Sequence, residues 1–131
     1  MGAPWLKAIL DTSVLIADDV PRLEGELAIS VAALAELHFG VLVTADAAVR
    51  AERLRRLSYL QRKFDALPVD GDVASSYGQL AAALVAAGRQ PRARAMHLLT
   101  AATAHAHSAR LYTRRAGDLA GIEHLIEIVA V

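Results

Sequence analysis

Short, mostly apolar runs alternate along the chain with longer segments in which apolar residues recur at helical spacing. The short runs end at polar or turn residues, a pattern typical of buried strands, and they predict strands over residues 6–10, 27–31, 110–113 and 126–131. The longer segments open near a polar residue or a proline, and they predict helices over residues 14–17, 32–43, 46–64, 72–87 and 92–107. Ser30 is a candidate helix cap, Gly88 is a stop signal for the fourth helix, and residues 67–69 (LPV) are expected as an extended link.

Strands that alternate with helices favour an α/β fold with a mainly parallel sheet. We expect an α/β/α sandwich with four or five strands, formed by residues 1–131 as a single domain. In such folds ligands bind beyond the carboxyl ends of the strands, so the residues that follow each strand are the first candidates for chemistry.

Composition narrows the class of protein. The chain of 131 residues is 55% hydrophobic and 21% charged, which excludes a disordered chain. It contains no cysteine, which excludes disulfides, thiolate metal sites and cysteine nucleophiles. No apolar run approaches the ~20 residues of a membrane span, and the N-terminus lacks the pattern of a signal peptide, so we expect a cytoplasmic protein that does not bind membranes.

Charge is balanced overall but uneven along the chain. The formal net charge is zero, yet no acidic residue lies between Asp72 and Asp118. That stretch carries six arginines, and a second basic cluster falls within residues 50–63. Arginine forks suit phosphate oxygens, which indicates a nucleic-acid partner, although ordinary solvated helix faces explain the same pattern.

Three carboxylates stand out by position. Asp11 follows the first predicted strand, Asp118 lies five residues beyond the strand predicted over residues 110–113, and Glu36 interrupts an otherwise apolar helix. Taken singly, they are equally well explained as helix caps, a turn residue or a solvent-facing side chain. Together they could form a site for Mg²⁺ or Mn²⁺, which would activate water and stabilise charge on a phosphate.

Four segments in order resemble the motifs of the PIN-domain ribonucleases of the VapC type: residues 9–16 (ILDTSVLI), 35–37 (AEL) with Gly40, 92–104 (RARAMHLLTAATA), and 111–118 (LYTRRAGD) with Gly121. The segments between these motifs also match the family, so the resemblance covers nearly the whole chain. No HExxH motif, glycine-rich phosphate loop or GxSxG elbow competes with it.

The resemblance implies a PIN-domain-like fold and the toxin of a type II toxin–antitoxin system. Such a toxin is an endoribonuclease that cleaves RNA with Mg²⁺ or Mn²⁺ in an acidic cluster, and the resemblance assigns Asp11, Glu36 and Asp118 to that cluster as metal-binding and catalytic residues. Ser13 and Thr113 sit where hydroxyls support it. A VapB-type antitoxin and a homodimeric partner are implied as well, and part of the apolar surface of helices 32–43 and 46–64 is expected to pack against one of them.

His97 departs from the family pattern, which has an aspartate at this position. We expect its imidazole to face the acidic cluster and to be a metal ligand there, with a preference for softer metals than Mg²⁺. We also expect nearby carboxylates to raise its pKa. The site is then altered but active, or it belongs to a relative of low activity, or the change arose in a cloned toxin, since Asp to His needs one base change.

Two other functions stay open. A PIN-like protein could bind antitoxin or RNA without cleaving, and metal titration would separate it from an enzyme. A phospho-acceptor regulator also gathers acids around Mg²⁺, but Asp18 and Asp19 lie too far past the first strand for that class, and no central predicted strand ends in aspartate.

Overall fold

The structure, a computed structural model, describes residues 6–131. Within this range a five-stranded, fully parallel sheet has the strand order β3-β2-β1-β4-β5. The strands are β1 (Lys7–Leu10), β2 (Glu26–Ser30), β3 (Ala66–Leu67), β4 (Arg110–Thr113) and β5 (Ile128–Ala130). Because every strand runs the same way, all carboxyl ends meet at one edge of the sheet.

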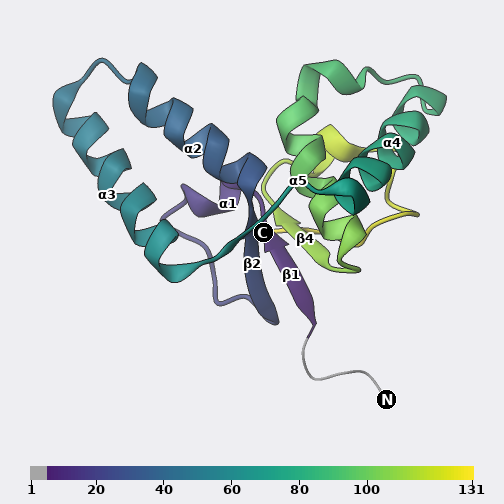
Figure 1. Cartoon of the computed structure of the whole chain (residues 1–131), viewed down its shortest axis with the longest axis horizontal. Helices are drawn as coiled ribbons and strands as arrows, with labels where there is room; N and C mark the ends of the chain where they lie inside the picture. The colour runs from purple at the N-terminus through teal and green to yellow at the C-terminus, as the bar shows by residue number, and fades with distance from the viewer. Residues whose placement is uncertain (1–5) are drawn as a thin grey trace.

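Helices cover both faces of the sheet. They are α1 (Thr12–Leu15), α2 (Val31–Val43), α3 (Ala47–Lys63), α4 (Gly71–Ala86) and α5 (Ala95–Ala106), with short 3-10 helices η1 (Pro91–Arg94) and η2 (Ala116–Leu119). Helices α2 and α3 pack together on one side and α4 and α5 on the other (Figure 1). The expected α/β/α sandwich with a parallel sheet is therefore confirmed.

The alternation of side chains along β1 divides the core in two. Ile9 points into a cluster with residues of α4 and α5, whereas Ala8 and Leu10 point into a second cluster with residues of α2 and α3. A strand buried on both faces has to be apolar throughout, which is why the first run of the sequence shows no polar alternation.

Side-chain caps fix where four helices begin. The residue before each helix accepts a hydrogen bond from a backbone N–H of the first turn, through Asp11, Ser30, Asp46 or Asp70. Ser30 was predicted in this role. At the other end of α4, Gly88 has a φ of 78°, a left-handed conformation that ends the helix and favours glycine.

Three elements differ from the prediction. The segment expected as an extended link contains the edge strand β3, because Leu67 precedes Pro68 and so favours extended backbone that pairs with β2. The helix expected over residues 92–107 is split, since Arg94 has non-helical φ and ψ of −135° and 33°. The last strand is shorter than the predicted 126–131.

Among residues 6–131, no helix has the length and apolar character needed to cross a bilayer. The sequence-based prediction about a signal peptide concerns in part residues 1–5, which lie outside the described range.

Candidate functional site

Asp11 lies at the carboxyl end of β1 and is fully buried. Its carboxylate accepts hydrogen bonds from the Ser13 hydroxyl at 2.5 Å, the Ser13 amide at 3.3 Å and the Thr113 hydroxyl at 3.0 Å. Burial works to raise its pKa, but His97, Ser13 and Arg115 together hold that pKa below the ordinary value. Ser13 and Thr113 thus support Asp11 as predicted, and the group is a carboxylate at neutral pH.

His97, on the first turn of α5, lies between two of the predicted acids. Its Nε2 is 3.5 Å from Asp11 Oδ1 and 3.5 Å from Thr113 Oγ1, while its Nδ1 is 3.7 Å from Asp118 Oδ2. The side chain is only 3% exposed. The expectation that this face of the segment looks into the acidic cluster is confirmed.

The expected direction of the His97 pKa is wrong. Burial, which disfavours the charged imidazolium, lowers the pKa below 6.5 and outweighs Asp11, which acts to raise it. Arg115 beside the ring lowers it further. The imidazole is therefore neutral near pH 7, and an ion pair with the acids is not what holds it.

Glu36 reaches the cluster from α2. It accepts a hydrogen bond from the Thr12 hydroxyl at 2.8 Å, so the residue after Asp11 ties α2 to the end of β1. Asp118, on η2, is partly exposed and pairs with Arg94 Nε at 3.3 Å. The sheet edge thus brings together three carboxylates that are 25 to 107 positions apart in the sequence.

Three arginines lie at the same site. The sequence predicted that arginines of the acid-free stretch could bind phosphate, but it assigned none of them a contact with the acids. Arg115 contacts Asp11 at 3.4 Å, Arg94 contacts Asp118, and Arg92 lines the adjoining cavity. The cavity, of about 500 Å³, is lined by Glu36, Arg92, Ala93, Arg94, Ala95, Met96, His97, Arg115 and Asp118. The one signal in the sequence was the acid-free stretch, which supplies all three arginines.

The arrangement does not fit one Mg²⁺ shared by Asp11 and Asp118, since the imidazole of His97 stands between the two carboxylates. Among residues 6–131, no three histidine or acidic side chains are grouped as a ready metal site. Asp11 is also occupied by hydroxyl and guanidinium donors. The metal-binding roles of Asp11, Glu36, Asp118 and His97 accordingly remain predictions.

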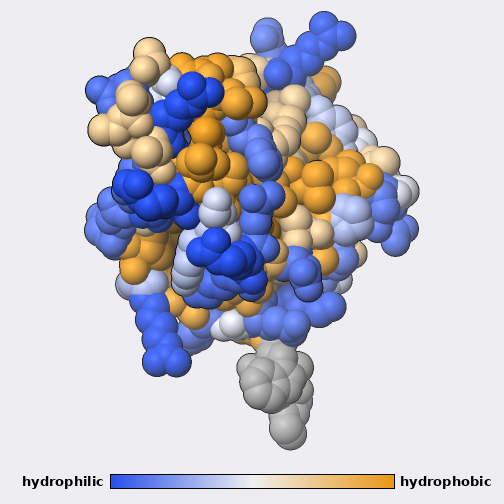
Figure 2. All heavy atoms as spheres, turned by 60° about the vertical axis from the view of Figure 1, so that its left-hand side comes forward, coloured by the Kyte–Doolittle hydropathy of each residue, from blue (hydrophilic) through white to orange (hydrophobic). Residues whose placement is uncertain are grey.

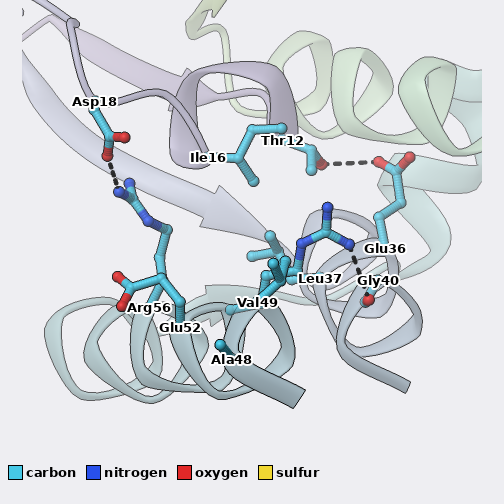
Figure 3. Close-up of a pocket in the computed structure, with 11 residues that line it drawn as sticks. Thr12, Ile16, Asp18, Glu36, Leu37, Gly40, Ala48, Val49, Glu52 and Arg56 are labelled. Atoms are coloured by element: carbon cyan, nitrogen blue, oxygen red, sulfur yellow. Dashed lines mark hydrogen bonds and ion pairs between the residues drawn. The ribbon is translucent and has the colours of Figure 1, made fainter. Parts of the chain in front are cut away.

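A second hollow, which we call the helix groove, lies on the other side of Glu36. It has a volume of about 630 Å³ between α1, α2 and α3 (Figure 3). Ile16, Leu37 and Val49 give it an apolar lining, and its charged residues include the pair Arg56–Asp18. Glu36 belongs to both hollows, so an occupant of the helix groove would lie beside the acidic cluster.

Exposed apolar side chains continue from the helix groove across the outer surface of α2 and α3. Figure 2 shows hydrophobic patches between charged residues on this side. On α2 the large exposed ones are Val31, Phe39, Leu42 and Val43, and on α3 they are Val49, Leu54 and Tyr59. Surface of this kind is typical of an interface.

Known proteins agree with the geometry, although no protein-family model matches the sequence. Ribonuclease VapC8 of Mycobacterium tuberculosis is 37% identical over 100 residues, which are 73% of this chain and 88% of that protein. Ribonuclease VapC5 of the same species is 38% identical over 90 residues, 64% of this chain and 66% of that protein.

A crystal structure of VapBC-5 from Mycobacterium tuberculosis, a member of the VapBC family of toxin–antitoxin systems, matches with a TM-score of 0.82 and 32% identity. The match covers 96% of this chain and 98% of the other. With the parallel sheet and the acidic cluster at its carboxyl edge, these likenesses show that the chain belongs to the VapC family of PIN-domain ribonucleases.

Proposed function

We propose that this chain is the toxin of a type II toxin–antitoxin pair and cleaves RNA at the acidic cluster, with an activity weakened by His97. One observation carries the proposal: Asp11, Glu36 and Asp118 gather at the carboxyl edge of the sheet in a member of a ribonuclease family. Mg²⁺ or Mn²⁺ as the cofactor remains part of the proposal, and so do the catalytic roles of the three acids.

The arginines of the cavity supply the positive charge that an acidic cluster lacks for binding RNA. Carboxylates repel phosphates, so a strand that approaches Asp118 and Glu36 needs cations beside them. Arg92 lines the cavity, and Arg94 and Arg115 hold guanidinium groups next to the acids. Guanidinium groups bind phosphate oxygens in a two-pronged geometry, so these residues would orient the strand over the cluster.

The alternative is a chain that binds RNA or antitoxin without cleaving. The position of His97 favours it, because the ring fills the space between Asp11 and Asp118 and replaces the negative charge that the family has there. An enzyme and a binding protein of this fold would share every other feature of the site.

The partner we propose is a VapB-type antitoxin in the helix groove. An apolar lining with charged residues beside it suits an amphipathic segment, whose apolar side chains would pack on Ile16 and Val49. Because Glu36 belongs to both hollows, a cationic side chain of that segment could reach the acids and block them. The exposed apolar residues of α2 and α3 are the surface we propose for the homodimer.

Cleavage of a fluorogenic single-stranded RNA tests the enzymatic proposal. We expect slow cleavage by the wild-type chain with Mg²⁺ or Mn²⁺ and at least a ~100-fold loss in Asp118→Asn, which removes the charge of a predicted catalytic acid. Asp19→Asn is the matched control, since Asp19 pairs with Arg114 and does not line the cavity. Cleavage that Asp118→Asn leaves intact would place the reaction elsewhere or in a contaminant.

A further inference from the structure

Arg56 belongs to the basic cluster of residues 50–63, but its side chain is directed toward α1 and not into solvent (Figure 3). Among the arginines of α3 it is the one that is not exposed. Its side chain is 32% exposed, against 67% for the neighbouring Arg55. An arginine that binds RNA phosphates needs free donors, whereas those of Arg56 are used within the chain.

The donors of Arg56 go to the end of α1. Its Nη1 donates to the carbonyl oxygen of Leu15 at 2.9 Å and to that of Ala17 at 3.3 Å, and its Nη2 donates to the carboxylate of Asp18. Leu15 is the last residue of α1, and the other two residues lie just beyond it. The last carbonyls of a helix have no partner within the helix, so a basic side chain that binds them fixes the end of the helix.

Helix α1 needs such support because it is a single turn of four residues, far shorter than a helix that is stable alone. Its start is capped by Asp11, which accepts a hydrogen bond from the amide of Ser13. Its buried residues Val14 and Leu15 pack into the core. Arg56 supplies the contact at the opposite end, so the position of α1 depends on α3 as well as on β1.

The first turn of α1 carries two hydroxyls of the site. Thr12 donates to Glu36 at 2.8 Å, and Ser13 donates to Asp11 at 2.5 Å. Figure 3 shows the Thr12–Glu36 contact and the contact of Arg56 with Asp18, with Ile16 between them. One short helix therefore connects Arg56 to two of the three acids.

We propose that Arg56 is a positioning residue for RNA cleavage: by holding the end of α1 it fixes the hydroxyls of Thr12 and Ser13, which orient Glu36 and Asp11. The hydrogen bonds of Arg56 go to none of the three acids, and Arg56 does not line the cavity beside them. Its effect on the reaction has to pass through α1. The inference rests on the proposed function, because it concerns the acids proposed to cleave RNA.

Hydrogen exchange of backbone amides tests the effect on α1 without RNA. The amides of Ile16 and Ala17 donate to carbonyls of α1, and we expect them to exchange at least about tenfold faster in Arg56→Gln than in the wild type. Arg55→Gln is the matched control, since it removes the same charge from an exposed position of α3, and it should leave their exchange unchanged. Unchanged exchange in Arg56→Gln, or an equal acceleration in α4, would overturn the proposal.

Steady-state cleavage of a single-stranded RNA separates positioning from RNA binding. We expect Arg56→Gln to lower kcat at least about tenfold and to keep KM within about twofold, because misplaced acids slow the reaction without removing an RNA contact. Arg55→Gln should change neither constant. A raised KM with an unchanged kcat would make Arg56 an RNA contact and overturn the proposal.

A double-mutant cycle tests the route from Arg56 to the acids. If Arg56 acts through Thr12, the loss of kcat in Arg56→Gln/Thr12→Val is smaller than the product of the two single losses. Losses that multiply would contradict a route through α1. A wild-type chain that cleaves no RNA would refute the proposed function, while hydrogen exchange would still decide whether Arg56 holds α1.

Discussion

At the scale of single residues, the environment of His97 decides the character of the site. The sequence located this residue beside the acids, because its motif and helical spacing are local properties. It gave the wrong direction for the pKa, because the direction depends on burial and on Arg115, which is 18 positions away. Neither the packing around a side chain nor its distant cations can be read from periodicity.

The lowered pKa of His97 predicts loss of stability on acidification. Below about pH 6.5 the unfolded chain takes up a proton at this ring that the folded chain refuses, so the free energy of unfolding decreases as the pH falls toward the folded pKa. Asp11 acts in the same direction at lower pH, below its ordinary pKa of 3.8. Urea unfolding between pH 7.5 and 5 should therefore show a smaller decrease for His97→Gln than for the wild type.

His124→Gln is the matched control, since it removes an exposed histidine, and its slope with pH should resemble that of the wild type. A wild-type chain that gains stability between pH 7.5 and 5 would contradict the buried, neutral imidazole.

Thr113 tests the hydroxyl support of Asp11. Its hydroxyl donates to Asp11 at 3.0 Å and accepts from the Arg115 amide at 2.9 Å, and the residue is fully buried. Thr113→Val keeps the shape but removes both bonds, so we expect a loss of about 1–3 kcal/mol in the free energy of unfolding. A change below the error of urea denaturation would mean that Ser13 alone satisfies the carboxylate.

At the scale of elements, local chemistry predicted the helix starts and stops and missed the features that depend on tertiary pairing. Ser30 and Gly88 have strong local preferences, and both act as predicted. Strand β3 has only two residues and exists because β2 lies beside it. The break at Arg94 coincides with an ion pair to Asp118, which the sequence of the helix does not contain.

A pair of glycine substitutions separates local preference from packing. Gly121 has a φ of 109°, and a Cβ there would lie 2.8 Å from Ala87 Cβ, so Gly121→Ala should lower the free energy of unfolding by about 1–3 kcal/mol. Gly78 lies within α4 with open space beside it, and Gly78→Ala should raise the same quantity by about 1 kcal/mol. Thermal or urea unfolding measures both, and equal signs would contradict the described backbone.

The helix groove predicts where the antitoxin binds. Ile16→Glu puts a charge into the apolar lining and should weaken the complex with the VapB-type antitoxin at least about tenfold. Val85→Glu is the control, because Val85 is similarly exposed, at 61% against 58% for Ile16, but lies on α4 away from the groove. Affinity measured by calorimetry that falls equally in both variants would place the antitoxin on another surface.

At the scale of the whole molecule, the topology of the sheet brings the residues of the site together. The fold class and the edge at which the acids meet followed from alternating strands and helices, because parallel strands share one carboxyl edge. The strand order and the arginines between the acids did not, since both depend on which distant segments pack together. The result is an acidic cluster that carries internal cations, with a histidine where the resemblance to the family implies an aspartate.

The most direct test of this account is RNA cleavage by His97→Asp compared with the wild type, in Mg²⁺ and in Mn²⁺, with His97→Asp/Asp118→Asn as the control. We expect His97→Asp to cleave at least about tenfold faster in Mg²⁺, because under the proposed function the added carboxylate would supply an oxygen ligand, and the ring between Asp11 and Asp118 is removed. The double variant should be inactive. Equal rates for His97→Asp and the wild type, or activity in the double variant, would contradict it.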